Sequence, residues 1–415
     1  GSALALSHQW IALGIALLFV AHPLQTQAVT YIVQRLASLM ALFYLGALCC
    51  WVEIYRSNRF SSKALWGVSF AICTLAACFT KENAFTLPLI LILMEALLFR
   101  RFSLRQWVGA GAVVGVLCLM VLLSSEGLLE LVDRRTRETP NISRWEYFSH
   151  QWIVLWIYLS KVIWPYPQLL DYGIQLDSFG RSTMVVAGMA HLLCVGLGLA
   201  LWRRLPLVTF GILFFYITHS VESGLIPIRD LAFEHRNYLP LFGVFLSVGA
   251  VILHLKERSL AATNGSILLF LGLLVFFAQA TWARNQMWDN QEALLKYDIT
   301  HTQGNVRALY NLAAWYQRNG RYDDSIEAMK AVVKANQGRL ELLHATTYVA
   351  ALIDLDLHDR ALSILGKVID MPMSPMARAA FLRQYGTVLT AKADDEAAVD
   401  VFEESMIASP LDYDG

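Results

Sequence analysis

The feature that most constrains this chain is a succession of apolar runs, each close to the length that crosses a lipid bilayer. A transmembrane helix needs about 17–25 predominantly apolar residues to cross roughly 30 Å of hydrocarbon. Nine such runs occur at 9–21, 37–53, 64–79, 84–99, 106–123, 183–202, 206–219, 239–254 and 265–283. They leave no polar helix face for water, which disfavours a buried helical core in a soluble protein. We therefore predict an all-α polytopic membrane domain over residues 1–283, with about nine spans.

Charge divides the chain into two parts. The whole chain is 16% charged and 56% hydrophobic, with a mean hydropathy of +0.47, whereas soluble chains carry about 25% charged residues. After residue 283 the apolar runs stop and charged residues become frequent, which predicts a soluble domain over 284–415. The composition excludes an ordinary soluble enzyme. The balance of 33 basic and 33 acidic residues lacks the basic excess of a nucleic-acid-binding protein.

The short loops between the runs indicate an orientation. Cytoplasmic loops carry an excess of Lys and Arg. Four short connections are basic: Arg56, Arg59 and Lys63; Arg100, Arg101 and Arg105; Arg203 and Arg204; Lys256 and Arg258. Counting 145–164 as a further span would move Arg203 and Arg204 to the opposite side. We therefore expect that segment to lie along the interface or to re-enter the membrane from the outer face. The ninth span then places the C-terminal domain on the extracytoplasmic side.

The C-terminal domain repeats itself with a period of 36 to 37 residues, which aligns Ser325, Ala361 and Ala398. Around an Asn319-Gly320 turn, apolar residues recur at helical spacing, a pattern typical of helix, turn, helix. The pattern resembles the tetratricopeptide repeat in about three copies, the number that such units need to bury a continuous core. Because the concave face of such solenoids usually binds polypeptide, we expect a protein or peptide partner. The alternative is a solenoid that only braces the membrane domain or dimerises.

Polar residues that are unusual near a membrane gather on the predicted outer face. Taken singly, each is also explained as a helix cap or a snorkelling anchor. Ionisable residues at membrane depth are nevertheless costly and tend to be functional. Together they predict a polar cavity at the outer leaflet, lined by His22, Arg35, Lys81, Glu82, Asp171, Glu222, Glu234, His235 and Arg236.

This mixture of cations and carboxylates suits a lipid-linked phosphate. Arg presents a planar fork to phosphate oxygens and Lys a point charge, while a neighbouring carboxylate is able to act as general base for an incoming hydroxyl. The sequence contains no phosphate-binding loop, dinucleotide fingerprint, nucleophile elbow or zinc-protease helix motif. The six cysteines lie within apolar runs as packing residues, and no cluster has metal-ligand spacing. We therefore name no metal ligand and leave a divalent-metal requirement open.

Several segments carry a resemblance to a known family. HPLQTQAVTYIVQR, FTKENAFTLPLILILMEALL, PYPQLLDYG, SVESGLIPI and EHRNYLPLFG precede the repeat-containing TWARNQMWDNQEALLKYDITHTQGNVRALYNLAAWYQRNGRYDDSI. In this combination the chain resembles, over nearly its whole length, bacterial membrane proteins with C-terminal tetratricopeptide repeats. Those proteins are similar to the transmembrane and tetratricopeptide-repeat O-mannosyltransferases and, more distantly, to the protein O-mannosyltransferases of the GT-C class.

The resemblance implies a GT-C-like fold that moves a sugar from a polyprenyl-phosphate donor to a hydroxyl acceptor, often protein Ser or Thr. It implies a bacterial inner membrane location with the repeats in the periplasm. Membrane lipid, the lipid-linked sugar and a polypeptide are then the partners. Carried over residue by residue, the resemblance implies that His22, Arg35, Lys81, Glu82, Asp171, Glu234 and Arg236 hold and orient the lipid phosphate or the sugar. Taking the resemblance together with the polar residues of the outer face, we predict substrate binding by His22, Gln27, Arg35, Lys81, Asp171, Tyr172, Glu222, His235, Arg236 and Tyr238.

The resemblance assigns the catalytic base less directly. The family's enzymes place a catalytic acid in the first outer loop, between their first two spans, and we expect this chain to begin at the third. Eukaryotic members commonly carry Glu in an HP-x-x-TEAV motif, where this chain has Gln27, an amide that cannot serve as a base. Glu82 and Glu234 are the remaining candidates for the base.

A second function class is a non-catalytic scaffold. In that case the membrane domain anchors the chain, and the repeats recruit partners for an envelope machine such as a pilus or secretion system. A transporter is disfavoured, because the polar residues gather at one face whereas a transport pathway needs them at the bilayer midplane.

The predicted orientation is testable with reporter fusions after residue 300. We expect a reporter that is active only outside the cytoplasm to be active there, because the basic loops hold the opposite ends of the spans in the cytoplasm. Activity from a reporter that works only in the cytoplasm would overturn the topology.

Overall fold

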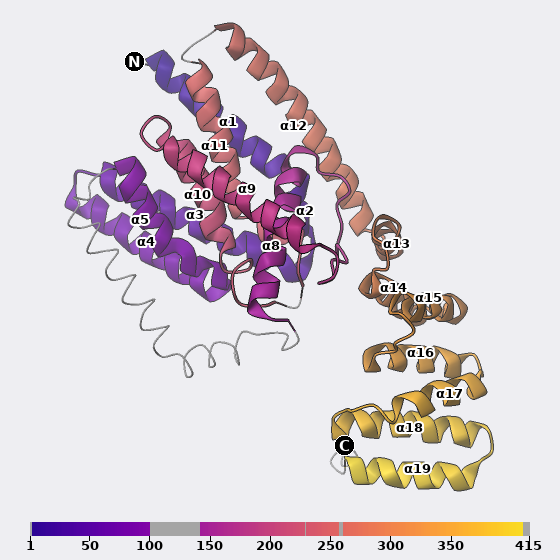
Figure 1. Cartoon of the computed structure of the whole chain (residues 1–415). Helices are drawn as coiled ribbons and strands as arrows, with labels where there is room; N and C mark the ends of the chain where they lie inside the picture. The colour runs from indigo at the N-terminus through magenta and orange to yellow at the C-terminus, as the bar shows by residue number, and fades with distance from the viewer. Residues whose placement is uncertain (1, 100–141, 229, 257–259, 410–415) are drawn as a thin grey trace. The chain divides into compact units, whose positions relative to one another are not determined.

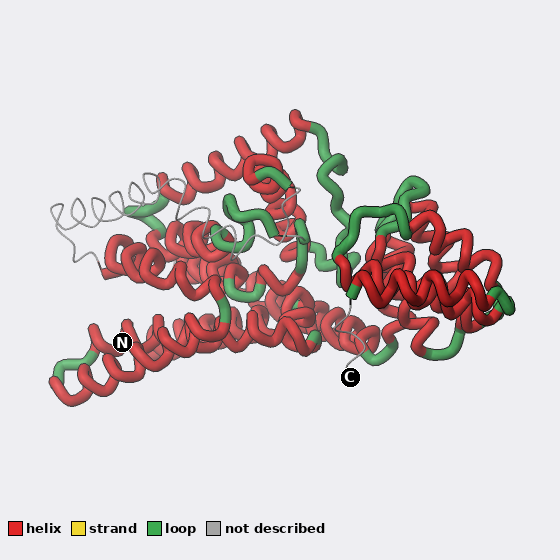
Figure 2. The backbone as a smooth tube through the Cα atoms, turned by 90° about the horizontal axis from the view of Figure 1, so that it is seen from below, coloured by secondary structure: helices red, strands yellow, loops and turns green. Residues whose placement is uncertain are grey.

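A computed structural model describes residues 2–99, 142–228, 230–256 and 260–409. The described part consists of helices joined by turns and loops, and it contains no strand (Figure 2). The expectation of an all-α fold is therefore confirmed for these residues.

The chain divides into two compact units. The first comprises residues 1–168 and 174–289, and the second comprises 169–173 and 290–415. The change in composition predicts a division at 283/284. The helix that carries the last apolar run continues to Trp288, so the structural division falls after that helix.

The first unit is built from long helices and short 3₁₀ turns (Figure 1). Its elements in chain order are α1 Ser2–Ala21, η1 Pro23–Gln25, α2 Thr26–Thr30, η2 Ile32–Gln34, α3 Arg35–Arg56, α4 Phe60–Thr80, η3 Glu82–Thr86, α5 Leu87–Met94, the π-helical η4 Glu95–Phe99, α8 Arg144–Ile163, α9 Arg181–Ala200, α10 Pro206–His219, η5 Glu234–Asn237, α11 Pro240–Lys256 and α12 Leu260–Trp288.

Five helical segments in the described ranges are long and apolar enough to cross a membrane. They are Ile32–Arg56, Phe60–Thr80, Glu82–Phe99, Arg181–Ala200 and Leu268–Trp288; His8–Ala21 and Pro23–Thr30, bent by 56°, make a sixth if counted as one span. The bend falls at His22-Pro23, where proline supplies no backbone donor. Helices α10 and α11 coincide with predicted runs but are shorter than the 18 residues required of a span. The predicted run 106–123 lies outside the described residues, and α8 does not qualify as a span.

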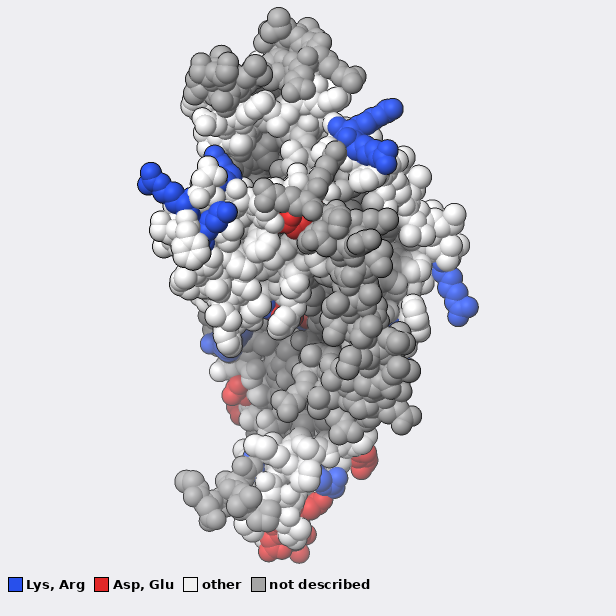
Figure 3. All heavy atoms as spheres, turned by 90° about the vertical axis from the view of Figure 1, so that its left-hand side faces the viewer, with Lys and Arg blue, Asp and Glu red and all other residues white. Residues whose placement is uncertain are grey.

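Two of these helices expose most of their apolar side chains. Helix α4 buries only Ala77, and α9 buries only His191 and Gly198. On the face drawn in Figure 3, wide areas of the described surface carry no charged side chain. An apolar helix with almost no buried face is unstable in water and suited to lipid. The exposure pattern is therefore compatible with membrane integration.

Helices α3, α4, α5, α10 and α11 share the largest apolar core of the first unit. Its fully buried members include Met40, Tyr44, Ala77, Leu87, Ile90, Phe214 and Leu239. A smaller core joins α1, α11 and α12 through Leu18, Leu241, Phe245 and Phe277.

Helices α10 and α11 approach each other at two glycines. A Cβ atom added at Gly211 would lie 2.2 Å from the Gly243 carbonyl oxygen, and one added at Gly243 would lie 2.4 Å from the Gly211 carbonyl oxygen. Small residues let helix backbones approach this closely. Helix α10 ends at His219, and the loop that leads to η5 begins there.

The second unit consists of antiparallel helix pairs. After α13 Gln291–His301, helix α14 Val306–Arg318 packs on α15 Tyr322–Ala335, α16 Leu342–Asp354 on α17 His358–Val368, and α18 Pro375–Ala391 on α19 Asp395–Ala408. Gly320 has a φ of 70° at the turn of the first pair, a conformation that glycine adopts without steric cost. The aligned residues Ser325, Ala361 and Ala398 are all buried in the second helices of their pairs.

The glycine crossing generates a stability prediction. Gly211→Ala is expected to lower the free energy of unfolding by about 1–3 kcal/mol, because the new methyl group meets a backbone carbonyl that cannot rotate away. Thermal unfolding of the purified protein in detergent measures the effect. The matched control is Gly196→Ala in α9, where a Cβ atom meets nothing within 4 Å. Equal melting temperatures for the two variants would contradict the close crossing.

Candidate functional site

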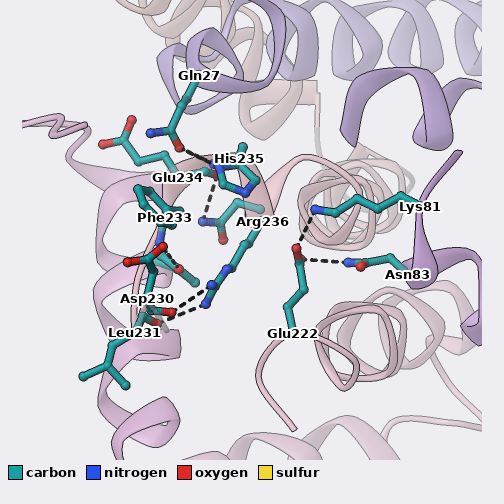
Figure 4. A network of polar contacts seen from close by, with 12 residues as sticks. Gln27, Lys81, Asn83, Glu222, Asp230, Leu231, Phe233, Glu234, His235 and Arg236 are labelled. Atoms are coloured by element: carbon teal, nitrogen blue, oxygen red, sulfur yellow. Dashed lines mark hydrogen bonds and ion pairs between the residues drawn. The ribbon is translucent and has the colours of Figure 1, made fainter. Parts of the chain in front are cut away.

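A buried polar cluster lies where the loop between α10 and α11 meets the turns after α1 and α4. We define the polar cluster as Gln27, Lys81, Asn83, Glu222, His235 and Arg236 (Figure 4). Lys81 Nζ lies 2.5 Å from Glu222 Oε1, and Asn83 Nδ2 donates to Glu222 Oε2 over 2.8 Å. The side chain of Lys81 is 13% exposed and that of Glu222 5% exposed. This is a nearly buried ion pair whose carboxylate has both oxygens occupied.

The turn between α4 and α5 positions Lys81 and Asn83. Helix α4 ends at Thr80, and η3 follows at once. The Thr86 hydroxyl donates to the Asn83 carbonyl over 2.7 Å and shares a 3.0 Å hydrogen bond with the buried Tyr44 hydroxyl. The turn is thereby tied to α3, which fixes the side chains that point toward Glu222.

Helix α8 positions the opposite side of the cluster. Tyr147 donates to the Glu222 carbonyl over 2.5 Å, Gln151 Nε2 donates to the Leu231 carbonyl over 3.0 Å, and the Tyr158 oxygen accepts from the Phe233 amide over 2.8 Å. These α8 side chains are fully buried. Their spacing of four and seven residues places them on one helix face. The segment predicted to lie at the interface or re-enter thus buries one face against the loop of the cluster.

The guanidinium of Arg236 organises the same loop from within. Its terminal nitrogens donate to the carbonyls of Asp230, over 2.8 Å, and Leu231, over 3.2 Å. The Nε–H group is buried and has no hydrogen-bond partner. An unpaired buried donor is costly, so an acceptor bound at this atom would be stabilising.

Two predicted motifs meet at Gln27. Its Oε1 atom accepts from the His235 backbone amide over 2.7 Å and from His235 Nδ1 over 3.1 Å. His22 caps the following turn by accepting from the Leu24 amide, and its Nε2 then donates to the Val162 carbonyl over 3.1 Å. Gln27 therefore connects the turn after α1 to η5, and His22 connects the same turn to the end of α8.

Electrostatics assigns a charge state to the loop residues of the cluster. Burial raises the pKa of Glu222, but the cations Lys81 and Arg236 outweigh it and lower that pKa to about 2. Burial, reinforced by Lys81, lowers the pKa of His235 to about 3. At neutral pH Glu222 is therefore a charged partner and His235 is neutral. The contribution of the ion pair to stability is complete above the ordinary carboxyl pKa and is lost as the pH falls toward 2.

The other predicted site residues are dispersed. Arg35 is exposed and donates to the Val29 carbonyl, and Glu82 is exposed. Glu234 is buried near Lys161, with which it interacts electrostatically, and the ring of Tyr238 packs edge-on against Phe19.

Asp171 and Tyr172 belong to the second unit. The buried carboxylate of Asp298 accepts from the Leu170 and Asp171 amides over 3.0 to 3.1 Å. Asn305 Nδ2 donates to the Asp171 carbonyl over 3.0 Å, and the Asp171 carboxylate lies 3.4 Å from Arg307. The segment 169–173 is thus part of the helix-pair unit.

Sequence reasoning missed Asn83, Tyr147, Gln151 and Tyr158. Asn83 stands two residues from Lys81 within the quoted KEN segment, so its position was a signal. The α8 residues recur at helical spacing within an aromatic-rich run, and that periodicity was a second signal.

Comparisons with models of known protein families, with curated proteins and with solved structures find no match for this chain. No group of three or more His, Cys, Asp or Glu side chains within the described ranges is arranged to hold a metal ion. The site must be interpreted from its own geometry.

The Lys81–Glu222 pair generates a prediction for stability. Lys81→Met is expected to cost about 3–5 kcal/mol, because it leaves the Glu222 carboxylate buried without its cation. The double variant Lys81→Met/Glu222→Gln removes both charges and is expected to recover most of that loss. Thermal unfolding in detergent measures both. A double variant no more stable than Lys81→Met alone would show that the pair does not couple.

Proposed function

We propose that the protein is a membrane glycosyltransferase that moves a sugar from a polyprenyl phosphate to a hydroxyl acceptor on the extracytoplasmic face. The observation that carries the proposal is the presence of two cations with unused donors in one cluster, Arg236 buried and Lys81 largely buried. Lys81 has three N–H groups, of which Glu222 takes one, and Arg236 keeps an unpaired Nε–H. A phosphate oxygen is the acceptor that both cations favour.

In this function the cations bind the phosphate and stabilise it as a leaving group. The bond between the sugar's anomeric carbon and the phosphate oxygen breaks, and a bond to the acceptor oxygen forms. The acceptor's hydroxyl proton passes to a carboxylate. Glu222 is unsuited to that role, because its low pKa and its two hydrogen-bond donors keep it ionised and occupied. Glu82 and Glu234 remain the candidates for the base.

The second unit has a proposed role in acceptor binding. We assign it to the tetratricopeptide class of helix-pair solenoids, with the polypeptide acceptor on the solenoid and the site in a GT-C-like membrane domain. The buried small residues Ser325, Ala361 and Ala398 at equivalent points of three helix pairs support this assignment. A bacterial inner membrane with the repeats in the periplasm is the corresponding location.

A membrane-anchored scaffold is the second candidate function. The observation in its favour is that most of the cluster is already satisfied internally. Glu222 is paired on both oxygens, and Arg236 binds two carbonyls of its own loop. Such a cluster also fits a purely structural role, in which it holds three segments of the chain together.

The two candidate functions predict different sugar-transfer activities for a variant in which the Lys81–Glu222 pair carries no charge. We expect Lys81→Met/Glu222→Gln, which removes both charges of the pair and leaves Arg236 as the cation of the cluster, to lower sugar transfer by about 10² or more, because the phosphate loses one of its two cations. The assay gives the purified full chain in lipid nanodiscs a panel of radiolabelled polyprenyl-phosphate hexoses and candidate envelope proteins. Lys63→Met, at the exposed start of α4, is the matched control and is expected to retain activity.

Two results would contradict the proposal. Wild-type transfer rates in a folded double variant would show that Lys81 serves only as the partner of Glu222. Absence of transfer from every donor by the folded wild-type protein would favour the scaffold.

A further inference from the structure

An apolar groove lies between helices α8, α9 and α10 of the first unit. Its volume is about 550 Å³, which falls within the roughly 300–1,000 Å³ of small-molecule sites. The walls are formed by side chains such as Phe148, Trp152, Leu155, Met189 and Val195. Among the described residues that line it, none is charged.

Several polar groups in the groove wall satisfy one another. His191 Nδ1 and the Tyr216 hydroxyl lie 2.9 Å apart, and His191 Nε2 lies 2.7 Å from the Trp152 carbonyl. The Ser220 hydroxyl donates to the Ile217 carbonyl over 2.7 Å. These groups therefore have hydrogen-bond partners within the protein and do not require a ligand.

Two further groups in the lining have no partner. His219 is 1% exposed and Ser223 is 5% exposed, yet neither ring nitrogen of His219 nor the Ser223 hydroxyl is hydrogen-bonded. The imidazole stacks on Tyr158. The Asn237 side chain, whose Oδ1 atom is also buried and unpaired, is a weak hydrogen-bond partner for one ring nitrogen, although the contact does not have the geometry of a full hydrogen bond. Buried polar groups are nearly always paired, so these two require an explanation.

We propose that the groove binds a neutral lipid with a hydroxyl head on a single apolar chain, and that His219 and Ser223 hydrogen-bond that hydroxyl. A neutral imidazole offers one donor and one acceptor, and a serine hydroxyl offers both. A hydroxyl head is complementary because it also donates and accepts. A phosphate head only accepts when ionised and finds no cation among the described lining residues.

The route of entry follows from the wall formed by α9. Val185, Met189 and Leu192 line the groove and are 53%, 66% and 74% exposed. Helix α9 is one of the candidate spans, and the exposed apolar face on which the groove opens is suited to hydrocarbon. A chain from the bilayer enters without crossing water. Because no charged residue contributes, the proposal is independent of the glycosyl-transfer site.

The test is competition for photo-crosslinking in lipid nanodiscs. A diazirine analogue of geranylgeraniol is crosslinked to the full-length protein, and peptide mapping locates the adduct. Unlabelled geranylgeraniol, its methyl ether and geranylgeranyl phosphate compete. We expect adducts on α8 to α10, and we expect the alcohol to compete about tenfold better than the ether, because only the alcohol donates as well as accepts.

Substitutions assign the effect to the two side chains. His219→Phe keeps a ring against Tyr158, removes both unpaired nitrogens and is expected to abolish the tenfold preference for the alcohol. Ser223→Ala provides a second, smaller change at the same site and is expected to reduce that preference. His254→Phe in α11, outside the lining, is the control and is expected to change nothing.

Three outcomes would overturn the inference. They are equal competition by the alcohol and its ether, stronger competition by the phosphate, and an unchanged preference in both His219→Phe and Ser223→Ala. Each is a binding result on folded protein, so none depends on whether the chain transfers sugar.

Discussion

The buried ion pair between Lys81 and Glu222 is the interaction on which the polar arrangement of the first unit depends. The two residues lie 141 positions apart, and both are largely removed from solvent. Taking two charges out of water costs more than their attraction returns unless the remaining oxygens and donors are also satisfied. Asn83 supplies the second donor to the carboxylate, and the Tyr44–Thr86 contact fixes the turn that presents Lys81. A buried ion pair that has a high desolvation cost and is held by additional hydrogen bonds is typical of a functional site, where charge is needed for binding or catalysis.

Helix α8 extends this arrangement across the loop between α10 and α11. Tyr147, Gln151 and Tyr158 bind backbone atoms of that loop from one helix face, so the loop keeps its shape although it contains little regular structure. The segment from His219 to Ser223 presents polar side chains in two directions. Glu222 belongs to the polar cluster, while His219 and Ser223 line the apolar groove. One loop thus borders a charged polar cluster and an apolar groove without charged lining residues in the described part of the chain.

Much of the fold was predictable because apolar runs and helical periodicity are local properties. The run at 37–53 lies within α3 and that at 183–202 largely within α9, and the small residues aligned by the repeat are buried in their helix pairs. The candidate site was predictable only in part. Gln27, Lys81, Glu222, His235 and Arg236 meet, but Glu82 and Arg35 are exposed, because a charge in a turn carries no local signal of the direction in which it points. The place of Asp171 depends on Asp298 and Asn305, more than 120 residues away. Sequence alone carries no record of such distant pairing.

The central claim is that the polar cluster binds a lipid-linked phosphate and does more than fasten three segments together. The most direct measurement is a structure of the full chain determined with a polyprenyl phosphate sugar bound in a lipid nanodisc. The account predicts phosphate oxygens within hydrogen-bonding distance of Lys81 Nζ and Arg236 Nε, the two cationic groups with unused donors. A head group bound elsewhere, with the Lys81–Glu222 pair and Arg236 unchanged, would contradict it.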